Sequence, residues 1–153
     1  MKVINIGDFI YDKSADSLPK INNIKGVSLI TTDKPLSYRK GNSRIVYIGQ
    51  TTKQGLKEIL TNLRDIVLEF LKSEHKKEIN KISTNFIVLS GNIEPCKIES
   101  AFIYLFKEIY GEKPKFNIHG TGFSSKKLEY LKEYGHGYSE SDLKEILKSF
   151  ESV

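Results

Sequence analysis

The stretch "SRIVYIGQTTKQGLKEIL", residues 43–60, joins two different sequence patterns. Residues 44–48 are rich in β-branched side chains and are followed by Gly49, whereas apolar residues recur at helical spacing beyond Thr51. We therefore expect a strand that ends at the glycine and a helix that is capped by Thr51 or Thr52. The apolar face of this helix would carry Leu56, Ile59, Leu60, Leu63, Val67, Phe70 and Leu71.

Composition limits the classes of protein to which this chain can belong. Its 153 residues, 39% hydrophobic and 28% charged, fit one globular domain with a real core. The excess of 24 Lys and Arg over 19 Asp and Glu gives a net charge of +5, which permits nucleic acid as a partner without establishing it. The single cysteine, Cys96, excludes an internal disulfide, so a reducing cytoplasm is the simplest location. Since no apolar run is long enough for a signal peptide or a membrane span, we expect a soluble protein without a membrane partner.

The remaining pattern indicates a small sheet with helices around it. Residues 26–32 are apolar and β-branched enough for a buried strand, and residues 33–43 contain the proline, glycine and asparagine of a loop. This loop would return the chain into residues 44–49 as an antiparallel hairpin. Residues 85–91 read as a third strand that ends in a glycine turn.

Helices are predicted in the second half of the chain. One begins at Pro95, where the missing N–H costs nothing, and stops at Gly111. Two shorter helices follow at residues 124–135 and 139–152, and the second is capped by Ser139 or Ser141. The charge-dense residues 72–81 are more typical of a solvated face than of a nucleic-acid contact. In the helix that begins at Pro95, the apolar face would carry Ile98, Ala101, Phe102, Leu105 and Ile109.

With this order of elements, four short segments together resemble the GIY-YIG nuclease superfamily. Gly26-Val27-Ser28 aligns with the first motif of that family and Tyr47-Ile48-Gly49 with the second. The later signature, a glutamate followed by an apolar helix and then Pro-x-Phe-Asn, matches Glu99 and Pro114-Lys115-Phe116-Asn117. The resemblance covers roughly residues 24–120.

The resemblance implies an α+β fold in which a small three-stranded antiparallel sheet is flanked by helices. Residues 1–153 would form a single domain with a lead-in at residues 1–23, a core at about 24–120 and a helical extension at 121–153. The implied activity is Mg²⁺-dependent hydrolysis of phosphodiester bonds in nucleic acid, with DNA as the favoured substrate and Mn²⁺ as a possible substitute metal.

The resemblance also assigns roles to three residues. Glu99 would be the metal ligand, since a hard carboxylate oxygen with waters and substrate phosphate makes a reasonable magnesium site. Tyr47 would place its hydroxyl beside the phosphate, and Asn117 would hydrogen-bond across the site or brace the loop. Each has an ordinary alternative: Glu99 on the polar side of its helix, Tyr47 as a cross-strand packing residue, and Asn117 as a turn residue. We expect Tyr47 and Glu99 to open onto one cleft on the sheet.

Two departures from the family pattern weaken the case for catalysis. Ser28 stands where the first tyrosine is usual, and serine is a far poorer proton relay. The family arginine on the helix after Tyr-Ile-Gly has no counterpart at the same spacing, so Lys57 or Arg64 could supply the cation, and Arg39 and Arg44 of the hairpin are further candidates. The candidate substrate-binding residues are Ser28, Arg39, Arg44 and Lys115. The chain is then either an endonuclease with a divergent site or a module on the same fold, for nucleic-acid binding or protein–protein contact, that has lost turnover.

Overall fold

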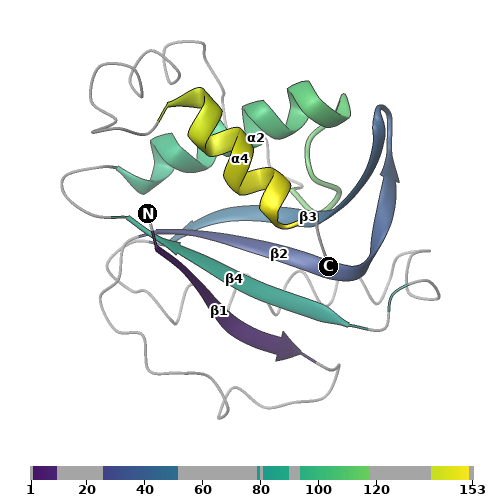
Figure 1. Cartoon of the computed structure of the whole chain (residues 1–153), viewed down its shortest axis with the longest axis horizontal. Coiled ribbons are helices and arrows are strands. Elements are labelled where there is room, and N and C mark those ends of the chain that lie inside the picture. Colours follow the sequence, from purple (N-terminus) through teal and green to yellow (C-terminus); the bar gives the residue numbers. More distant parts are fainter. Residues whose placement is uncertain are drawn as a thin grey trace.

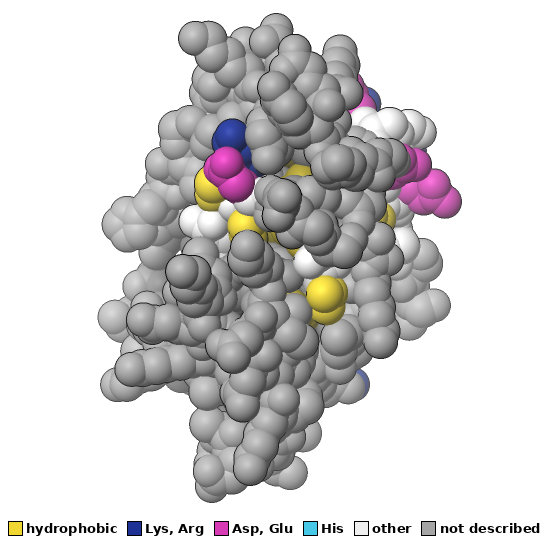
Figure 2. Space-filling model, turned by 90° about the vertical axis from the view of Figure 1, so that its left-hand side faces the viewer, with side chains coloured by type: hydrophobic (Ala, Val, Ile, Leu, Met, Phe, Trp, Pro, Cys, Tyr) yellow, Lys and Arg dark blue, Asp and Glu magenta, His cyan; other side chains and the backbone are white. Residues whose placement is uncertain are grey.

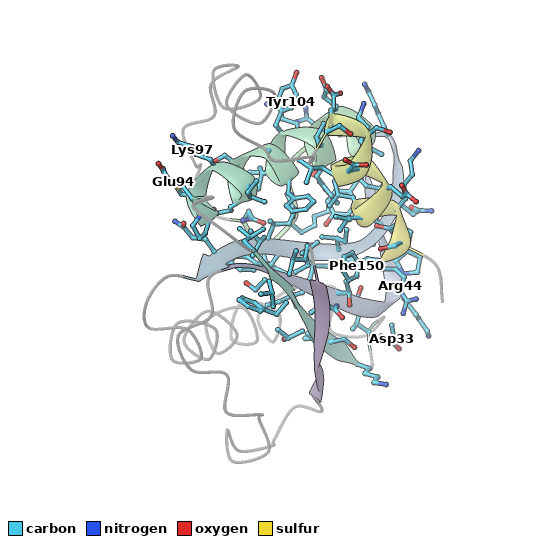
Figure 3. All side chains as sticks on the ribbon, turned by 60° about the vertical axis from the view of Figure 1, so that its left-hand side comes forward. Asp33, Arg44, Glu94, Lys97, Tyr104 and Phe150 are labelled. Atoms are coloured by element: carbon cyan, nitrogen blue, oxygen red, sulfur yellow. The ribbon has the colours of Figure 1, made fainter. Side chains whose placement is uncertain are left out.

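The computed structural model describes residues 2–9, 26–51, 79, 81–89, 94–117 and 139–151. These residues form a sheet with two helices on one side of it, next to β3 (Figures 1 and 3). The elements are β1 Lys2–Phe9, β2 Gly26–Tyr38, β3 Gly41–Thr51, β4 Ile82–Val88, α2 Pro95–Tyr110 and α4 Glu140–Ser149. All strand pairs are antiparallel, in the order β1-β4-β2-β3. The predicted α+β class with an antiparallel sheet is therefore confirmed.

The three expected strands are β2, β3 and β4, and the structure adds a fourth. Strand β1 lies within the segment that was predicted to be a lead-in, and it pairs with β4 from Lys2 opposite Val88 to Phe9 opposite Ile82. Strand β4 begins three residues before the expected start at Asn85. The central pair of the sheet is thus β4 and β2, which leaves β3 at one edge.

The prediction of a loop at residues 33–43 is wrong. Strand β2 runs on to Tyr38, β3 begins at Gly41, and only Arg39 and Lys40 form the turn. Gly41 has a backbone φ of 108°, a region that favours glycine, and its position after the turn fits a tight hairpin. The turn signals in the sequence were real, but they mark a short turn at the end of a long hairpin.

Two features explain why this segment is strand. Leu36 and Tyr38 are buried while their neighbours Pro35 and Ser37 are exposed, which is the period-two alternation of a strand with one face packed. Pro35 lies between Thr31 and Leu36, where the pairing of β2 with β3 is interrupted, so its missing N–H removes no ladder hydrogen bond. Packing on α2 therefore outweighs the local signals for a loop.

Helix α2 has the ends that the sequence predicts. Pro95 is its first residue, and Gly111 has a left-handed φ of 80° and donates its N–H to the carbonyl of Lys107. The ring of Phe106 meets the ring of Tyr38 edge-on with centroids 5.1 Å apart, and the ring of Tyr110 lies 5.9 Å from Tyr38. These contacts fix the second half of α2 to the β2–β3 hairpin.

Helix α4 is capped as predicted and is anchored at its far end. The Ser139 side chain accepts a hydrogen bond from the N–H of Asp142, whose carboxylate accepts from the N–H of Ser139. Beyond the helix, the carboxylate of Glu151 accepts hydrogen bonds from the Ser43 hydroxyl at 2.5 Å and from the N–H of Arg44 at 2.9 Å. The end of α4 is therefore held on β3.

Several predicted features lie outside the described residues. They include the helix expected after Tyr-Ile-Gly, with Lys57 and Arg64, the helix at residues 124–135, and most of residues 72–81. Thr51, one of the two expected helix caps, is the last residue of β3. Neither α2 nor α4 has the length and apolar character that a membrane crossing requires.

Candidate functional site

Tyr47 and Gly49 lie on the same face of β3, and the tyrosine ring covers the glycine. A Cβ atom placed on Gly49 would lie 2.5 Å from Cε1 and 2.7 Å from Oη of Tyr47. The expectation that the strand ends at this glycine is wrong, because β3 continues to Thr51. The glycine is required because the ring needs the space that a side chain would fill. Tyr47 is half-buried and packs against the hydrophobic core.

Ser28 is the cross-strand partner of Gly49, so its side chain shares the face on which Tyr47 lies. The residue is only 2% exposed, and its hydroxyl has no hydrogen-bond partner among the described residues. The hydroxyl of Thr84, the partner of Ile30 in β4, is likewise buried without a partner. Buried unpaired hydroxyls are uncommon and costly, which sets this part of the sheet apart from an ordinary core.

Asn117 braces the strand that carries Tyr-Ile-Gly. Its side-chain Nδ2 donates to the carbonyl of Ile48 at 2.7 Å, and its Oδ1 accepts from the N–H of Ile48 at 3.0 Å. The residue is 7% exposed, and both ends of its amide are used in these bonds. Asn117 is also a turn residue, since its backbone N–H donates to the carbonyl of Pro114 at 3.0 Å, so the turn and the side-chain brace occur together.

The residues before Asn117 continue this contact along the edge of β3. The N–H of Phe116 donates to the carbonyl of Val46 at 2.9 Å, and the N–H of Lys115 donates to the hydroxyl of Tyr38 at 3.2 Å. The Tyr38 hydroxyl in turn donates to the carbonyl of Ile45 at 2.8 Å. Burial raises the pKa of Tyr38 above its usual range, so the phenol stays neutral and can donate this bond.

Glu99 is buried on α2, with 6% of its surface exposed. It precedes Phe106 by seven residues and Tyr110 by eleven, so helical geometry places it on the stripe that packs on Tyr38. The alternative in which Glu99 is an ordinary residue on the polar side of the helix is therefore wrong. A carboxylate that is buried this far is ordinarily held by a partner, and Glu99 does have an interaction within the protein.

The predicted metal site depends on the single carboxylate of Glu99 and stays an expectation from the sequence. Within the described residues, no group of three or more His, Cys, Asp and Glu side chains could hold a metal ion. Magnesium often binds through one or two carboxylates and keeps several waters, so it does not require such a group. Glu99 is the residue that would hold it.

One of the predicted cations, Arg39, lies at the other end of the hairpin from Tyr47. The β2–β3 ladder pairs Ser28 with Gly49 near one end and Tyr38 with Gly41 at the other. Arg39 is in the turn beyond the second pair, so it lies far along the hairpin from Tyr47. The Arg39 side chain is 80% exposed, and its Nε lies 3.9 Å from a carboxylate oxygen of Glu112.

The other two predicted cations that the structure describes, Lys115 and Arg44, are held by neighbouring groups. Nζ of Lys115 lies 3.3 Å from Glu112 and 4.9 Å from the centre of the Tyr38 ring. Nε of Arg44 donates to the carbonyl of Thr32 at 2.8 Å. Arg39 and Lys115 are therefore brought together around Glu112, and Arg44 braces the two strands of the hairpin.

Three residues that organise this region were not singled out from the sequence. Tyr38 joins the hairpin to α2, Glu112 gathers Arg39 and Lys115, and Glu151 fixes the end of α4. The alternation of Leu36 and Tyr38 with exposed residues was a usable signal for the first. The roles of Glu112 and Glu151 depend on contacts between distant segments, which the sequence pattern does not encode.

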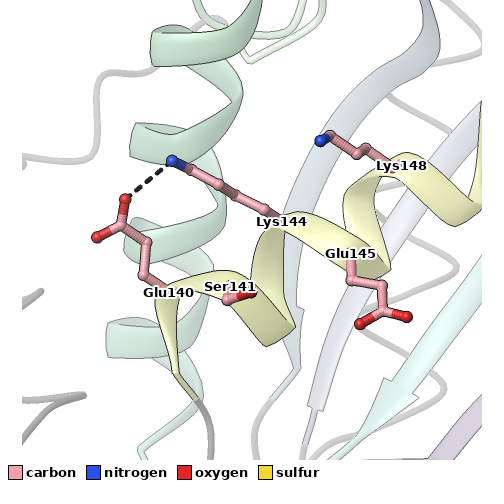
Figure 4. Close-up of a pocket in the computed structure, with 5 residues that line it drawn as sticks. All are labelled: Glu140, Ser141, Lys144, Glu145 and Lys148. Atoms are coloured by element: carbon pink, nitrogen blue, oxygen red, sulfur yellow. Dashed lines mark ion pairs between the residues drawn. The ribbon is translucent and has the colours of Figure 1, made fainter.

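A surface cavity of about 460 Å³ lies against α4, lined by Glu140, Ser141, Lys144, Glu145 and Lys148 (Figure 4). Nζ of Lys144 lies 2.9 Å from the carboxylate of Glu140. Acidic and basic side chains balance in this cavity, and none of the candidate residues lines it. We therefore assign it no part in the site.

Comparison with known proteins adds no assignment. No family model, curated protein or solved structure matches the chain. The likeness to GIY-YIG nucleases, the magnesium site and the cytoplasmic location therefore stay predictions from the sequence.

Proposed function

We propose that the chain is a divergent endonuclease of GIY-YIG type, which hydrolyses phosphodiester bonds in nucleic acid with DNA as the favoured substrate. The observation that supports this most strongly is the contact between the two motif segments. Asn117 of the later signature bonds to both backbone groups of Ile48, at the centre of Tyr47-Ile48-Gly49. Two residues 69 positions apart in sequence are thus in contact, which supports a site that both motif segments share.

The buried carboxylate of Glu99 supports a metal-assisted reaction. Magnesium bound there would polarise the phosphoryl oxygen and stabilise the oxygen that leaves. Tyr47 would orient the phosphate or the attacking water, and Asn117 would hold the strand that presents Tyr47. In the hydrolysis, water forms a new bond to phosphorus and one phosphorus–oxygen bond of the backbone breaks. Lys57 or Arg64 would supply the remaining positive charge.

The test is cleavage by the purified chain. Supercoiled plasmid DNA and a structured RNA would be incubated with Mg²⁺, with Mn²⁺ and with EDTA. We expect Mg²⁺-dependent nicking or linearisation of the plasmid, and none in EDTA. Cleavage that persists in EDTA would contradict the metal site, and cleavage of RNA alone would correct the substrate.

A nucleic-acid-binding module without turnover is the second candidate, and one observation favours it. Ser28 occupies the place of the family's first tyrosine, is buried, and has no hydrogen-bond partner in the described part of the chain. A site that lacks the hydroxyl of this tyrosine at its surface has lost one means of activating water. Binding to nucleic acid without any cleavage in Mg²⁺ or Mn²⁺ would favour this second function.

A further inference from the structure

The end of the β2–β3 hairpin, residues 34–44, forms what we call the basic arm. It contains four basic residues and no acidic residue. Its inward positions, Leu36 and Tyr38, are buried, whereas Lys34, Arg39 and Lys40 are exposed. In Figure 1 the arm curls up at the right-hand side of the molecule, beyond the last pair of β2 with β4. The arm thus presents its cations outward from a packed base.

The end of α2 extends this surface from a distant part of the sequence. The N–H of Lys40 donates to the carbonyl of Tyr110 at 2.9 Å, and Gly111 lies against the side chains of Arg39 and Lys40. Lys107 and Lys113 near this contact are exposed. Glu112 also lies here, but its carboxylate is shared between Arg39 and Lys115.

The charge of the described surface is unevenly distributed. Residues 139–151, which include α4, contain four acidic and two basic residues, and one of the acids, Glu151, bonds to Ser43 and Arg44 at the base of the arm. At the N-terminal end of α2, Lys97 is paired with Glu94 at 3.4 Å, and both lie far from Arg44 of the arm in Figure 3. The face shown in Figure 2 has only single basic side chains among its described residues. Among the described residues, exposed basic side chains are therefore most concentrated around the arm.

We propose that the basic arm, with the adjoining end of α2, binds the phosphodiester backbone of nucleic acid at a distance from the candidate cleavage site. Several separated and exposed cations suit an extended polyanion better than one small anion, which would need a single convergent pocket. The packing of Tyr38 on Phe106 and Tyr110 holds the arm in one position, so little freedom is lost on binding. This inference rests on the proposed action on nucleic acid and adds where the backbone is held.

The arm can be tested by removing its exposed charges and comparing a matched control. The arm variant is Lys34→Gln/Arg39→Gln/Lys40→Gln, and the control, Lys97→Gln/Lys144→Gln/Lys148→Gln, loses the same net charge elsewhere. Binding of a fluorescent DNA duplex of about 20 base pairs would be measured in EDTA by anisotropy over a range of salt concentrations. Thermal melting would check that both variants stay folded.

The arm variant should have a Kd at least about ten-fold higher than that of the unaltered chain. The slope of log K against log salt should also become smaller by up to about 2.7, which is about 0.9 for each phosphate that the arm no longer neutralises. The control should bind nearly as the unaltered chain does. Equal losses in both variants, or an unchanged arm variant, would overturn the proposal, as would binding of anionic lipid vesicles but not of the duplex. If the duplex binds through the arm but is not cleaved with Mg²⁺, the inference stands and only the proposed catalysis fails.

Discussion

The side-chain amide of Asn117 makes two hydrogen bonds to one residue of β3, Ile48, and so ties the segment after α2 to the Tyr-Ile-Gly strand. Asn117→Ala removes both bonds from a site that is 7% exposed, so we expect the free energy of unfolding to fall by about 2 kcal/mol. Urea denaturation measures this change. Asn42→Ala, at an exposed position beside the hairpin turn, is the control and should change stability little. A loss below about 0.5 kcal/mol for Asn117→Ala would show that the brace is dispensable.

The contact between Tyr47 and Gly49 predicts an energetic coupling. A methyl group on Gly49 would meet the end of the Tyr47 ring, so Gly49→Ala must displace the ring and should destabilise the protein by about 1 kcal/mol or more. In the background of Tyr47→Ala the same substitution should cost much less, because the obstacle is gone. A double-mutant cycle by denaturation measures the coupling, which we expect to be about 0.5–2 kcal/mol. Strictly additive effects would contradict this packing.

Two buried serines in neighbouring strands should respond oppositely to the same change. Ser28→Ala removes a hydroxyl that has no partner among the residues that the structure describes, so stability should be unchanged or higher. Ser43→Ala removes a hydroxyl that bonds to Glu151 and accepts from the N–H of Ile45, so it should cost about 1–3 kcal/mol. Chemical denaturation of the two variants in parallel would show the difference. A larger loss for Ser28→Ala than for Ser43→Ala would mean that the Ser28 hydroxyl has an important partner.

Alkaline pH should destabilise the fold through Tyr110. Burial, followed by the negative charge of Glu151, raises the pKa of Tyr110 to about 12 from an ordinary value near 10. The folded state therefore holds its proton at a pH where the unfolded state has lost it, and this stability is complete below about pH 10 and is lost as the pH rises toward 12. Tyr110→Phe should make the fall in the free energy of unfolding above pH 10 shallower, by at most about 1.4 kcal/mol per pH unit. An equal slope in both proteins would contradict the shift.

The elements that the sequence predicts well are those with local signals at their ends. Pro95 and Gly111 bound α2, and Ser139 caps α4, because each residue acts through its own backbone geometry or its own side chain. The arm was mistaken for a loop because its strand character depends on the packing of Tyr38 on α2, a contact between residues far apart in sequence. Turn residues in a sequence show that the chain reverses, but they do not show how long the flanking strands are.

Part of the candidate site was also predictable from local sequence patterns. The motif segments were found as short sequence patterns, and the bonds between Asn117 and Ile48 agree with their being neighbours. The burial of Glu99 was not predicted, because the expected apolar face of α2 was narrow, whereas residues 98–103 of this helix are all buried. Arg39 was expected near the site because it belongs to the hairpin, but the hairpin is long enough to carry it far along the sheet.

The most direct test of the central claim is the single-turnover rate of DNA cleavage in Mg²⁺ by Glu99→Gln and by Glu94→Gln. Both variants change one carboxylate to an amide at the start of α2, but Glu99 is buried and Glu94 is exposed. We expect Glu99→Gln to lower the rate at least about 100-fold while duplex binding in EDTA is retained, because only the metal-assisted transition state requires the carboxylate. Glu94→Gln should cleave at the rate of the unaltered chain. Cleavage by folded Glu99→Gln at the unaltered rate would contradict the account.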